Sequence, residues 1–273
     1  MLKSEIFYFS GSGNSYAVAR DIADELNAKL LPIIPLVKQD TIKSDSRVIG
    51  IVFPIYDFKA PEIVNSFIKK LTNLESRYIF AVCTYGVMPL KTMKKLNKTL
   101  NLFNGNLSGG FTVKMPHNGL GYNKISEVKQ KKMFTKWNQK NKIIINYVKK
   151  QKQGTLECTG GFGYFVLLGI FIRMIPKLIP MLGRALIKGW DSLGFYFDEN
   201  CNSCGICEKV CPVDNIKMIK DKPIWGDNCL SCFACIHWCP QESIQIANLT
   251  KKMHRYHHPD VNLNDIINQK KNN

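Results

Sequence analysis

A cysteine motif that occurs twice constrains this chain more than any other feature. The stretches CNSCGICEKVCP at residues 201–212 and CLSCFACIHWCP at residues 229–240 both have the spacing C-x2-C-x2-C-x3-C-P, offset by 28 residues. Three closely spaced thiolates can surround one corner of an iron–sulfur cube, and a fourth cysteine that precedes proline reaches the other cube. The spacing therefore predicts two 4Fe-4S clusters with crossed ligand sets.

The predicted ligands divide the eight motif cysteines between the two clusters. One set is Cys201, Cys204, Cys207 and Cys239, and the other is Cys229, Cys232, Cys235 and Cys211. Two zinc ions are the alternative for eight sulfurs, but zinc sites usually use C-x2-C pairs without a third cysteine, so the spacing favours iron. A module of roughly 50 residues would depend on its clusters for much of its fold.

The N-terminal stretch FYFSGSGNSYAVA, residues 7–19, joins a predicted strand to a predicted helix. Residues 6–9 form a short apolar run, and the apolar residues of 17–26 have helical spacing. The first amides of a helix have no intrahelical acceptors, so this glycine- and serine-rich turn is typical of a phosphate site. It lacks the lysine of a Walker loop and the third glycine of a dinucleotide loop. A well-capped helix that binds nothing is the alternative.

The remaining pattern resembles the phosphate loop of flavodoxins, in which hydroxyls and amides bind the phosphate of FMN without a cationic side chain. Its residues are Ser10, Gly11, Ser12, Gly13, Asn14 and Ser15. Strand-like runs recur at residues 6–9, 29–34, 48–54, 78–83 and 111–115, with helical stretches between most of them. This alternation predicts an α/β fold with a doubly wound parallel sheet, and five strands fit the flavodoxin-like order 2-1-3-4-5. The helix expected in the short link at residues 36–46 is reduced or absent.

Ligands of such a sheet bind beyond the carboxyl ends of its strands. The candidates there are Pro54, Ile55 and Tyr56 after the third strand, Thr84, Tyr85 and Gly86 after the fourth, and His117 and Asn118 after the fifth. Flavodoxins similarly place residues of the third- and fourth-strand loops, often aromatic ones, beside the flavin ring. His117 is a candidate proton donor to a substrate, with an ordinary packed or surface histidine as the alternative.

The net charge of +17 is concentrated in one segment. Residues 91–152 contain fifteen lysines, no arginine and a single acidic residue, Glu127, which gives that segment a net charge of +14. Apolar residues at roughly helical spacing predict that its last part is a helix with a basic outer face: Ile125, Val128, Phe134, Trp137, Ile144 and Val148. The face is either simply solvated or a docking surface for an acidic low-potential redox protein, such as a ferredoxin or flavodoxin. Nucleic acid fits less well, because no recognition motif accompanies the charge.

An uncharged stretch at residues 158–172 is shorter than the roughly 20 residues that span a bilayer, so no transmembrane segment is expected. It predicts an apolar connector that packs on the domains, with a cover for the flavin or a peripheral membrane contact as alternatives. No signal-peptide pattern precedes the first strand, which predicts a cytoplasmic protein. Ten cysteines there indicate metal or redox chemistry, and Cys83 and Cys158, outside the motifs, are expected to be free thiols.

The whole pattern resembles the EFR-type flavodoxin/ferredoxin fusion proteins of anaerobes, and the ending HRYHHPD at residues 254–260 also resembles theirs. The resemblance implies a flavodoxin-like FMN-binding domain at 1–157, an apolar connector at 158–198, a small α+β two-cluster ferredoxin domain at 199–248 and a tail at 249–273. It implies an oxidoreductase in which a low-potential donor reduces the clusters and FMN passes electrons to a small-molecule acceptor. A pure electron carrier, or an interaction protein with an empty flavodoxin half, are the alternatives.

Overall fold

The computed structural model describes residues 3–119, 124–159, 169, 194–247 and 249–271. Its N-terminal part is built on a sheet in which every pair of neighbouring strands is parallel. The strands are β1 (Ser4–Tyr8), β2 (Lys29–Pro32), β4 (Val48–Pro54), β6 (Tyr78–Tyr85), β7 (Leu107–Lys114) and β8 (Thr155–Leu156), in the order β2-β1-β4-β6-β7-β8. The first five strands have the predicted flavodoxin-like order, so that prediction is confirmed, and β8 adds a two-residue edge strand.

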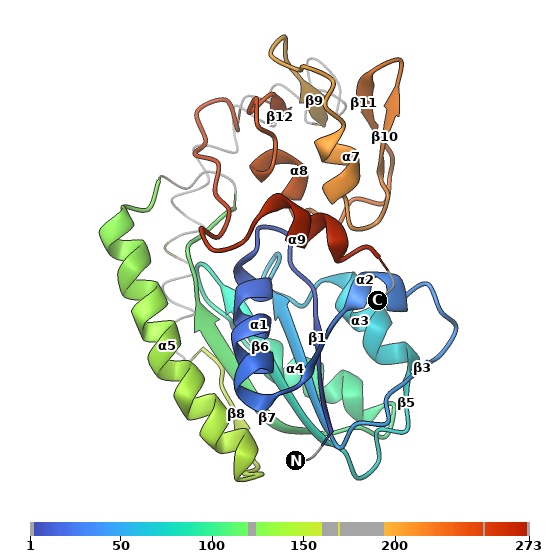
Figure 1. Ribbon diagram of the computed structural model, residues 1–273, viewed down its shortest axis with the longest axis vertical. Coiled ribbons are helices and arrows are strands. Elements are labelled where there is room, and N and C mark those ends of the chain that lie inside the picture. Colours follow the sequence, from blue (N-terminus) through green and yellow to red (C-terminus); the bar gives the residue numbers. More distant parts are fainter. Residues whose placement is uncertain (1–2, 120–123, 160–168, 170–193, 248, 272–273) are drawn as a thin grey trace.

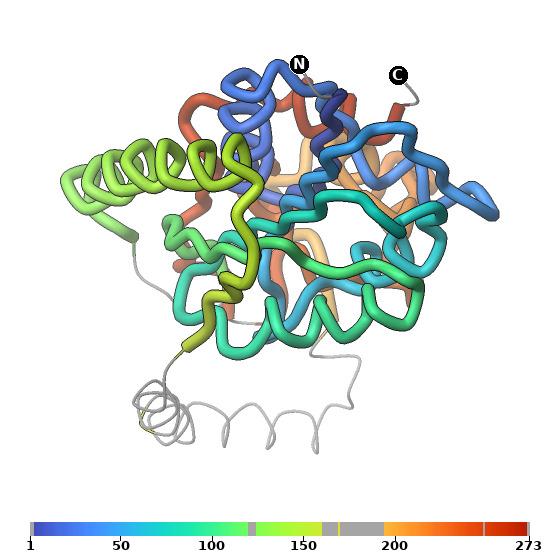
Figure 2. Tube along the Cα trace, turned by 90° about the horizontal axis from the view of Figure 1, so that it is seen from below, coloured from blue at the N-terminus to red at the C-terminus, as the bar shows by residue number. Residues whose placement is uncertain are grey.

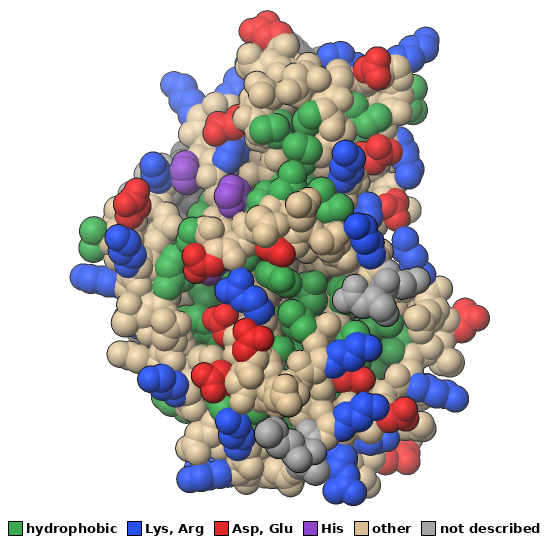
Figure 3. Space-filling view, in the orientation of Figure 1, with side chains coloured by type: hydrophobic (Ala, Val, Ile, Leu, Met, Phe, Trp, Pro, Cys, Tyr) green, Lys and Arg blue, Asp and Glu red, His purple; other side chains and the backbone are tan. Residues whose placement is uncertain are grey.

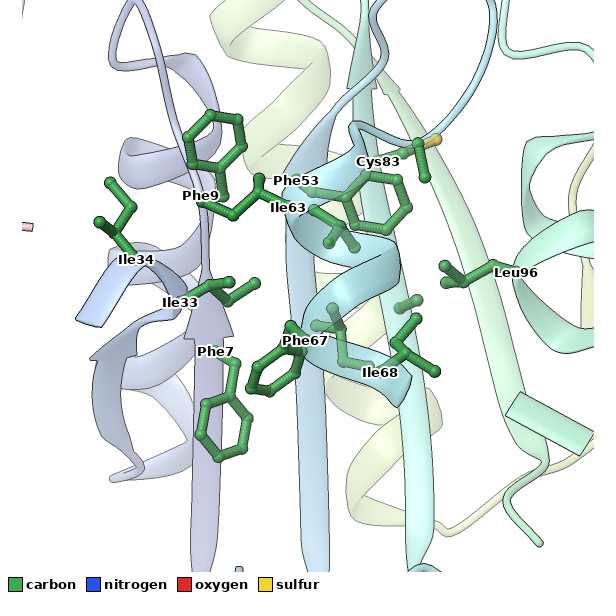
Figure 4. Packing of buried hydrophobic residues seen from close by; sticks show 14 of the residues in the cluster. Phe7, Phe9, Ile33, Ile34, Phe53, Ile63, Phe67, Ile68, Cys83 and Leu96 are labelled. Atoms are coloured by element: carbon green, nitrogen blue, oxygen red, sulfur yellow. The ribbon is translucent and has the colours of Figure 1, made fainter. Parts of the chain in front are cut away.

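Helices cover both faces of this sheet, as Figure 2 shows from below. One face packs on α1 (Asn14–Leu26) and α5 (Glu127–Lys149), and the other on α3 (Glu62–Lys70) and α4 (Thr92–Asn101). Alternate side chains of each strand enter the two cores, which is why the strands read as continuous apolar runs. Figure 4 shows the second core, where Phe53 of β4 lies beside Ile63 of α3, and Phe67 of α3 packs on Phe7 of β1.

The link after β2 contains only a four-residue helix, α2 (Ile33–Leu36), and a two-residue strand, β3 (Ile42–Lys43), that pairs with β5 (Leu71–Thr72). The prediction of a reduced helix is therefore confirmed. The helix takes up residues 33 and 34, which were expected to continue the strand. β2 pairs with β1 only as far as Tyr8. Beyond Tyr8 the chain enters the glycine-rich turn, so residues 33 and 34 have no strand to pair with.

The predicted basic helix is α5, but one of its expected core residues is wrong. Trp137, Ile144 and Val148 are buried against the sheet, whereas Val128 is 64 % exposed. Val128 lies in the first turn of α5, which extends past the part that packs on the sheet, so it lies outside the core formed by the described residues.

The C-terminal part consists of short antiparallel pairs and short helices. Its elements are β9 (Phe195–Phe197) paired with β12 (Ile244–Ile246), β10 (Ile216–Ile219) paired with β11 (Lys222–Trp225), and the helices α7 (Ile206–Val210), α8 (Ala234–His237) and α9 (Leu263–Asn268). The two cysteine motifs fold alike: Ser203 and Gly205 have positive φ, and so do Ser231 and Phe233, 28 residues later. Such alternating turns direct successive amides inward, a geometry that suits an anionic centre.

The C-terminal part lies over the carboxyl ends of the parallel strands, and the segment carrying α9 passes between the two parts (Figure 1). Residues 195–197, placed by sequence at the end of the connector, pair with β12. Most of the connector, residues 160–168 and 170–193, lies outside the described residues, so the structure leaves the interpretations of it untested. None of the described helices is long and apolar enough to cross a bilayer.

Candidate functional site

A pocket opens at the carboxyl ends of the strands, where the sequence places a flavin. It is lined by Ser10, Gly11, Ser12, Asn14, Ser15, Pro54, Ile55, Tyr56, Thr84, Tyr85, Gly86, Met115, Pro116 and Asn118. All of the predicted cofactor-binding residues line it except Gly13, the residue that directly precedes α1. The residues from the end of β7 complete the wall, and none of the lining residues is charged.

The glycine-rich turn leaves the start of α1 available to an anion. Gly13 has φ 95°, a conformation that glycine adopts without strain, and its amide donates to Ser10 Oγ at 3.1 Å. No side chain caps the first turn of α1, and no acidic residue lies in it. Ser12 Oγ accepts from Asn118 Nδ2 at 2.7 Å, so the loop is also tied to the end of β7. Hydroxyls and amides without cations are the groups expected to surround a phosphate here.

The ring end of the pocket contains Tyr56 and Tyr85. Within the described part of the chain, the buried hydroxyl of Tyr56 makes no well-formed hydrogen bond; burial raises its pKa well above the usual value, and a weak contact with the Gly11 backbone offsets this only in part. A buried polar atom that lines a pocket and has no partner calls for a ligand, since an unpaired group costs about 1–3 kcal/mol. Burial also raises the pKa of Tyr85. The residues present therefore fit a flavin.

His117 lies beside the pocket and not in its wall. Its ring packs so closely on Gly86 that a Cβ there would overlap it, and its Nδ1 accepts from the Gly119 amide at 2.8 Å. Burial lowers the pKa of His117 to about 4, so the imidazole is neutral at pH 7. His117 lines a neighbouring hollow with Gln130 and His254, and its role as a proton donor stays a prediction.

The eight motif cysteines surround two separate hollows in the crossed sets that the spacing predicts. Cys201, Cys204, Cys207 and Cys239 line one, and Cys211, Cys229, Cys232 and Cys235 line the other. Within the described residues, no three Cys, His, Asp or Glu side chains are placed to hold a single metal ion. Sulfurs spread around a hollow fit a centre of several atoms, such as a 4Fe-4S cube, better than zinc.

Both hollows have polar contacts to sulfur at the same repeat position. The Asn215 amide donates to Cys211 Sγ at 3.2 Å, and Ser243 Oγ lies 3.4 Å from Cys239 Sγ, each four residues after the last cysteine of its motif. Burial raises the pKa of Cys207 to about 11 and that of Cys232 to about 12. A thiolate at such a buried position needs a compensating positive charge nearby.

The flavin pocket and the second hollow touch each other. A Cβ on Gly11 would lie 3.0 Å from the Cys232 carbonyl oxygen. Two side chains of the second motif donate to carbonyls beside the pocket: Trp238 Nε1 to Gly11 at 2.9 Å and His237 Nε2 to Asn118 at 2.6 Å. Neither contact was predicted from the sequence, because the residues around His237 and Trp238 give no indication of which part of the N-terminal domain they contact.

The two remaining cysteines play no part in these sites. Cys83 faces the core, fully buried, and burial raises its pKa; it is not among the residues that line the pocket. Cys158 is exposed.

Comparison with family models matches residues 195–217 to the 4Fe-4S binding domain. A comparison with curated proteins finds no significant match. Similar solved structures include the flavodoxin of Megasphaera elsdenii (18 % identity, 41 % of this chain, 85 % of that chain, TM-score 0.32) and a flavoprotein with FMN from Lactobacillus acidophilus (16 %, 41 %, 93 %, 0.34). Another is rubredoxin:oxygen oxidoreductase of Desulfovibrio gigas (16 %, 55 % and 36 %, 0.39).

The fold assignment rests on the strand order itself, and the iron–sulfur assignment rests on the motif and its family match. The chain thus joins a flavodoxin-like N-terminal domain to a 4Fe-4S binding domain in a cysteine-rich C-terminal region.

Proposed function

We propose that the chain is an iron–sulfur flavoprotein oxidoreductase that holds two 4Fe-4S clusters and FMN and passes electrons from a low-potential donor to a small-molecule acceptor. When bound, the clusters carry electrons singly, whereas the flavin takes them singly and releases them in pairs. The single observation that supports this proposal most is the contact of Gly11 with Cys232, because one residue borders the flavin pocket and the other borders a cysteine hollow.

The chain's own residues have distinct roles in this proposal. The loop at residues 10–15 would bind the phosphate through hydroxyls and amides. Tyr56 and Tyr85 would flank the ring. The crossed cysteine sets would hold the clusters and, through them, the fold of the C-terminal part.

The hollow beside the pocket is the candidate site for a small-molecule acceptor. It is lined by His117, Gln130, His254 and Tyr256 among others, and it shares Pro116 and Asn118 with the flavin pocket. A small acceptor there would lie beside the flavin site, with neutral imidazole and amide groups to orient it. A pure carrier needs no such hollow, and remains the second candidate.

The basic face of α5 supports an acidic redox protein as the electron donor. Lysines stand out along α5 in Figure 3, and Lys129, Lys131, Lys132, Lys136 and Lys142 are exposed. A field of this sign would speed the approach of an acidic partner and would weaken as salt screens it.

The test is anaerobic purification of the full chain, followed by its absorbance spectrum and its iron and flavin content. We expect about eight irons and one FMN per chain. Reduction by a ferredoxin or flavodoxin, then a screen of acceptors under turnover, separates an enzyme from a carrier. Zinc in place of iron, or a chain that binds no flavin, would overturn the proposal.

A further inference from the structure

The segment after the last cysteine motif returns to the glycine-rich loop of the N-terminal domain. The His258 amide donates to the Ser12 carbonyl at 2.9 Å, and Tyr256 Oη donates to Asn14 Oδ1 at 2.7 Å. In Figure 1, α9 lies across the top of β1 and α1. Two residues of the loop are therefore held by a segment more than 240 residues away in sequence.

Gln269 makes the most specific of these contacts. Its Nε2 donates to the Ser10 carbonyl at 2.7 Å, and its Oε1 accepts from the Ser10 amide at 3.3 Å. Both ladders of β1 end just before this point: the Phe9 amide makes its last bond to β4, at Val52, and β2 pairs with β1 only as far as Tyr8. Gln269, 1 % exposed, thus acts as a strand neighbour for both peptide groups of Ser10.

The same segment packs behind the loop. A Cβ on Gly13 would lie 3.0 Å from Val261 Cβ and 3.1 Å from His258 Cβ. The segment is in turn fixed to the cysteine-rich part, because Lys270 Nζ pairs with Asp214 at 2.7 Å. Its helix begins with a capping box between Asn262 and Asp265. The loop therefore has a rigid support that is anchored in the other domain.

We infer that residues 254–270 set the conformation of the phosphate loop and thereby give the pocket its preference for a flavin that carries a phosphate, with Gln269 as the main positioning residue. None of these residues lines the pocket, so they act through Ser10, Ser12 and Asn14. The inference rests on the proposed function, since it concerns the phosphate of FMN. Among the described residues, neither Tyr56 nor Tyr85 at the ring end is bonded to this segment, so we expect ring binding to be independent of the support.

The test compares FMN with riboflavin, which has the same ring and no phosphate. Full-length chain with its clusters intact is stripped of flavin, and both dissociation constants are measured by flavin fluorescence. Gln269→Met keeps the length of the side chain and removes both hydrogen bonds. We expect it to weaken FMN binding about tenfold or more and riboflavin binding less than about twofold. The control is Asn268→Ala, an exposed residue of the same helix, with both constants unchanged.

A second variant guards against a folding failure of the first. Tyr256→Phe keeps the ring and removes one hydrogen bond to Asn14, and we expect a loss of about fivefold for FMN alone. Equal losses for both flavins, or no loss in either variant, would overturn the inference. If the wild-type chain bound FMN and riboflavin equally, both the phosphate role of the loop and the inference would be wrong. If the wild-type chain preferred FMN and both variants kept that preference, only the inference would be wrong.

Discussion

Gly11 lies against Cys232 so closely that a Cβ on Gly11 would come within 3.0 Å of the Cys232 carbonyl oxygen and 2.6 Å of the Tyr56 hydroxyl. Glycine is needed here for its size and not for its dihedral angles, since its φ is not positive. The two candidate cofactor sites consequently meet where the Gly11 backbone approaches the Cys232 carbonyl, with the Tyr56 hydroxyl beside them.

Gly11→Ala tests this contact. The added methyl must push the loop or the second cysteine motif away, which we expect to lower the free energy of unfolding by about 1–3 kcal/mol and to slow flavin reduction by dithionite-reduced clusters. Urea unfolding and anaerobic stopped-flow measure the two effects. Gly169→Ala is the control, because a Cβ there meets no atom of the described residues within 4 Å. Wild-type behaviour in both assays would contradict the contact.

Gly13→Val addresses the loop at a position where the backbone does require glycine. With φ 95° and the tail behind it, valine would be strained by about 1–3 kcal/mol and would also displace Val261 and His258. We expect FMN retention to be lost while the iron content stays intact. Gly154→Val is a matched control with φ 93° and open space, so it carries the strain alone and should keep FMN. Equal FMN occupancy in both variants would move the phosphate elsewhere.

Cys204→Ala tests the crossed ligand sets. Cys204 borders only the hollow of Cys201, Cys207 and Cys239, so its loss should reduce the iron content from about eight to about four per chain. Iron analysis and the spectrum of anaerobic protein measure this. Cys158→Ala, an exposed cysteine outside both motifs, should leave the iron content unchanged. A complete loss of iron with a folded chain would show that the clusters do not assemble separately.

His117 makes stability depend on pH. Its folded-state pKa of about 4 lies below the ordinary value of 6.5, so the unfolded chain takes up the proton first and stability falls as pH drops below about 6.5. When the pH falls from 7.5 to 5.5, this difference lowers the free energy of unfolding by about 1.4 kcal/mol. His117→Gln should remove that part of the pH dependence in anaerobic urea unfolding. The substitution His254→Gln, at an exposed histidine, should change the pH dependence of unfolding less. Equal changes from the two substitutions would show that His117 is not buried.

Local patterns predicted the parts of the molecule whose chemistry is local. The cysteine spacing identified the sulfur sets, because three ligands of each set lie within seven residues. The serine and glycine pattern at residues 10–15 located a turn that lines the pocket for the same reason, and its role in phosphate binding stays a prediction. β8 was missed because two residues, Thr155 and Leu156, show no periodicity.

The support behind the loop could not be predicted from the sequence. Gln269 contacts Ser10 across a sequence separation of 259 residues, and a single glutamine in a polar tail has no distinguishing pattern. The available signal was the spacing of Asn262 and Asp265, which is typical of a helix start. That signal shows that the tail folds, not where it packs, because its position depends on both domains at once.

Trp238 offers the sharpest test of whether the seam between the domains serves electron transfer or stability alone. Trp238→Phe removes the donor to the Gly11 carbonyl, and Trp137→Phe, at a similarly buried indole, removes a bond to the partly exposed Asp21, at 2.7 Å within the N-terminal domain. Each loss should lower the free energy of unfolding by about 1–3 kcal/mol. Only Trp238→Phe should also slow flavin reduction by the clusters, because only Trp238 holds the loop against the second cysteine motif. Equal slowing in both variants would mean that the overall stability of the protein governs the rate. No slowing in either variant would mean that the other contacts between the domains, including His237 and the tail, fix the distance between the second cysteine hollow and the pocket without Trp238.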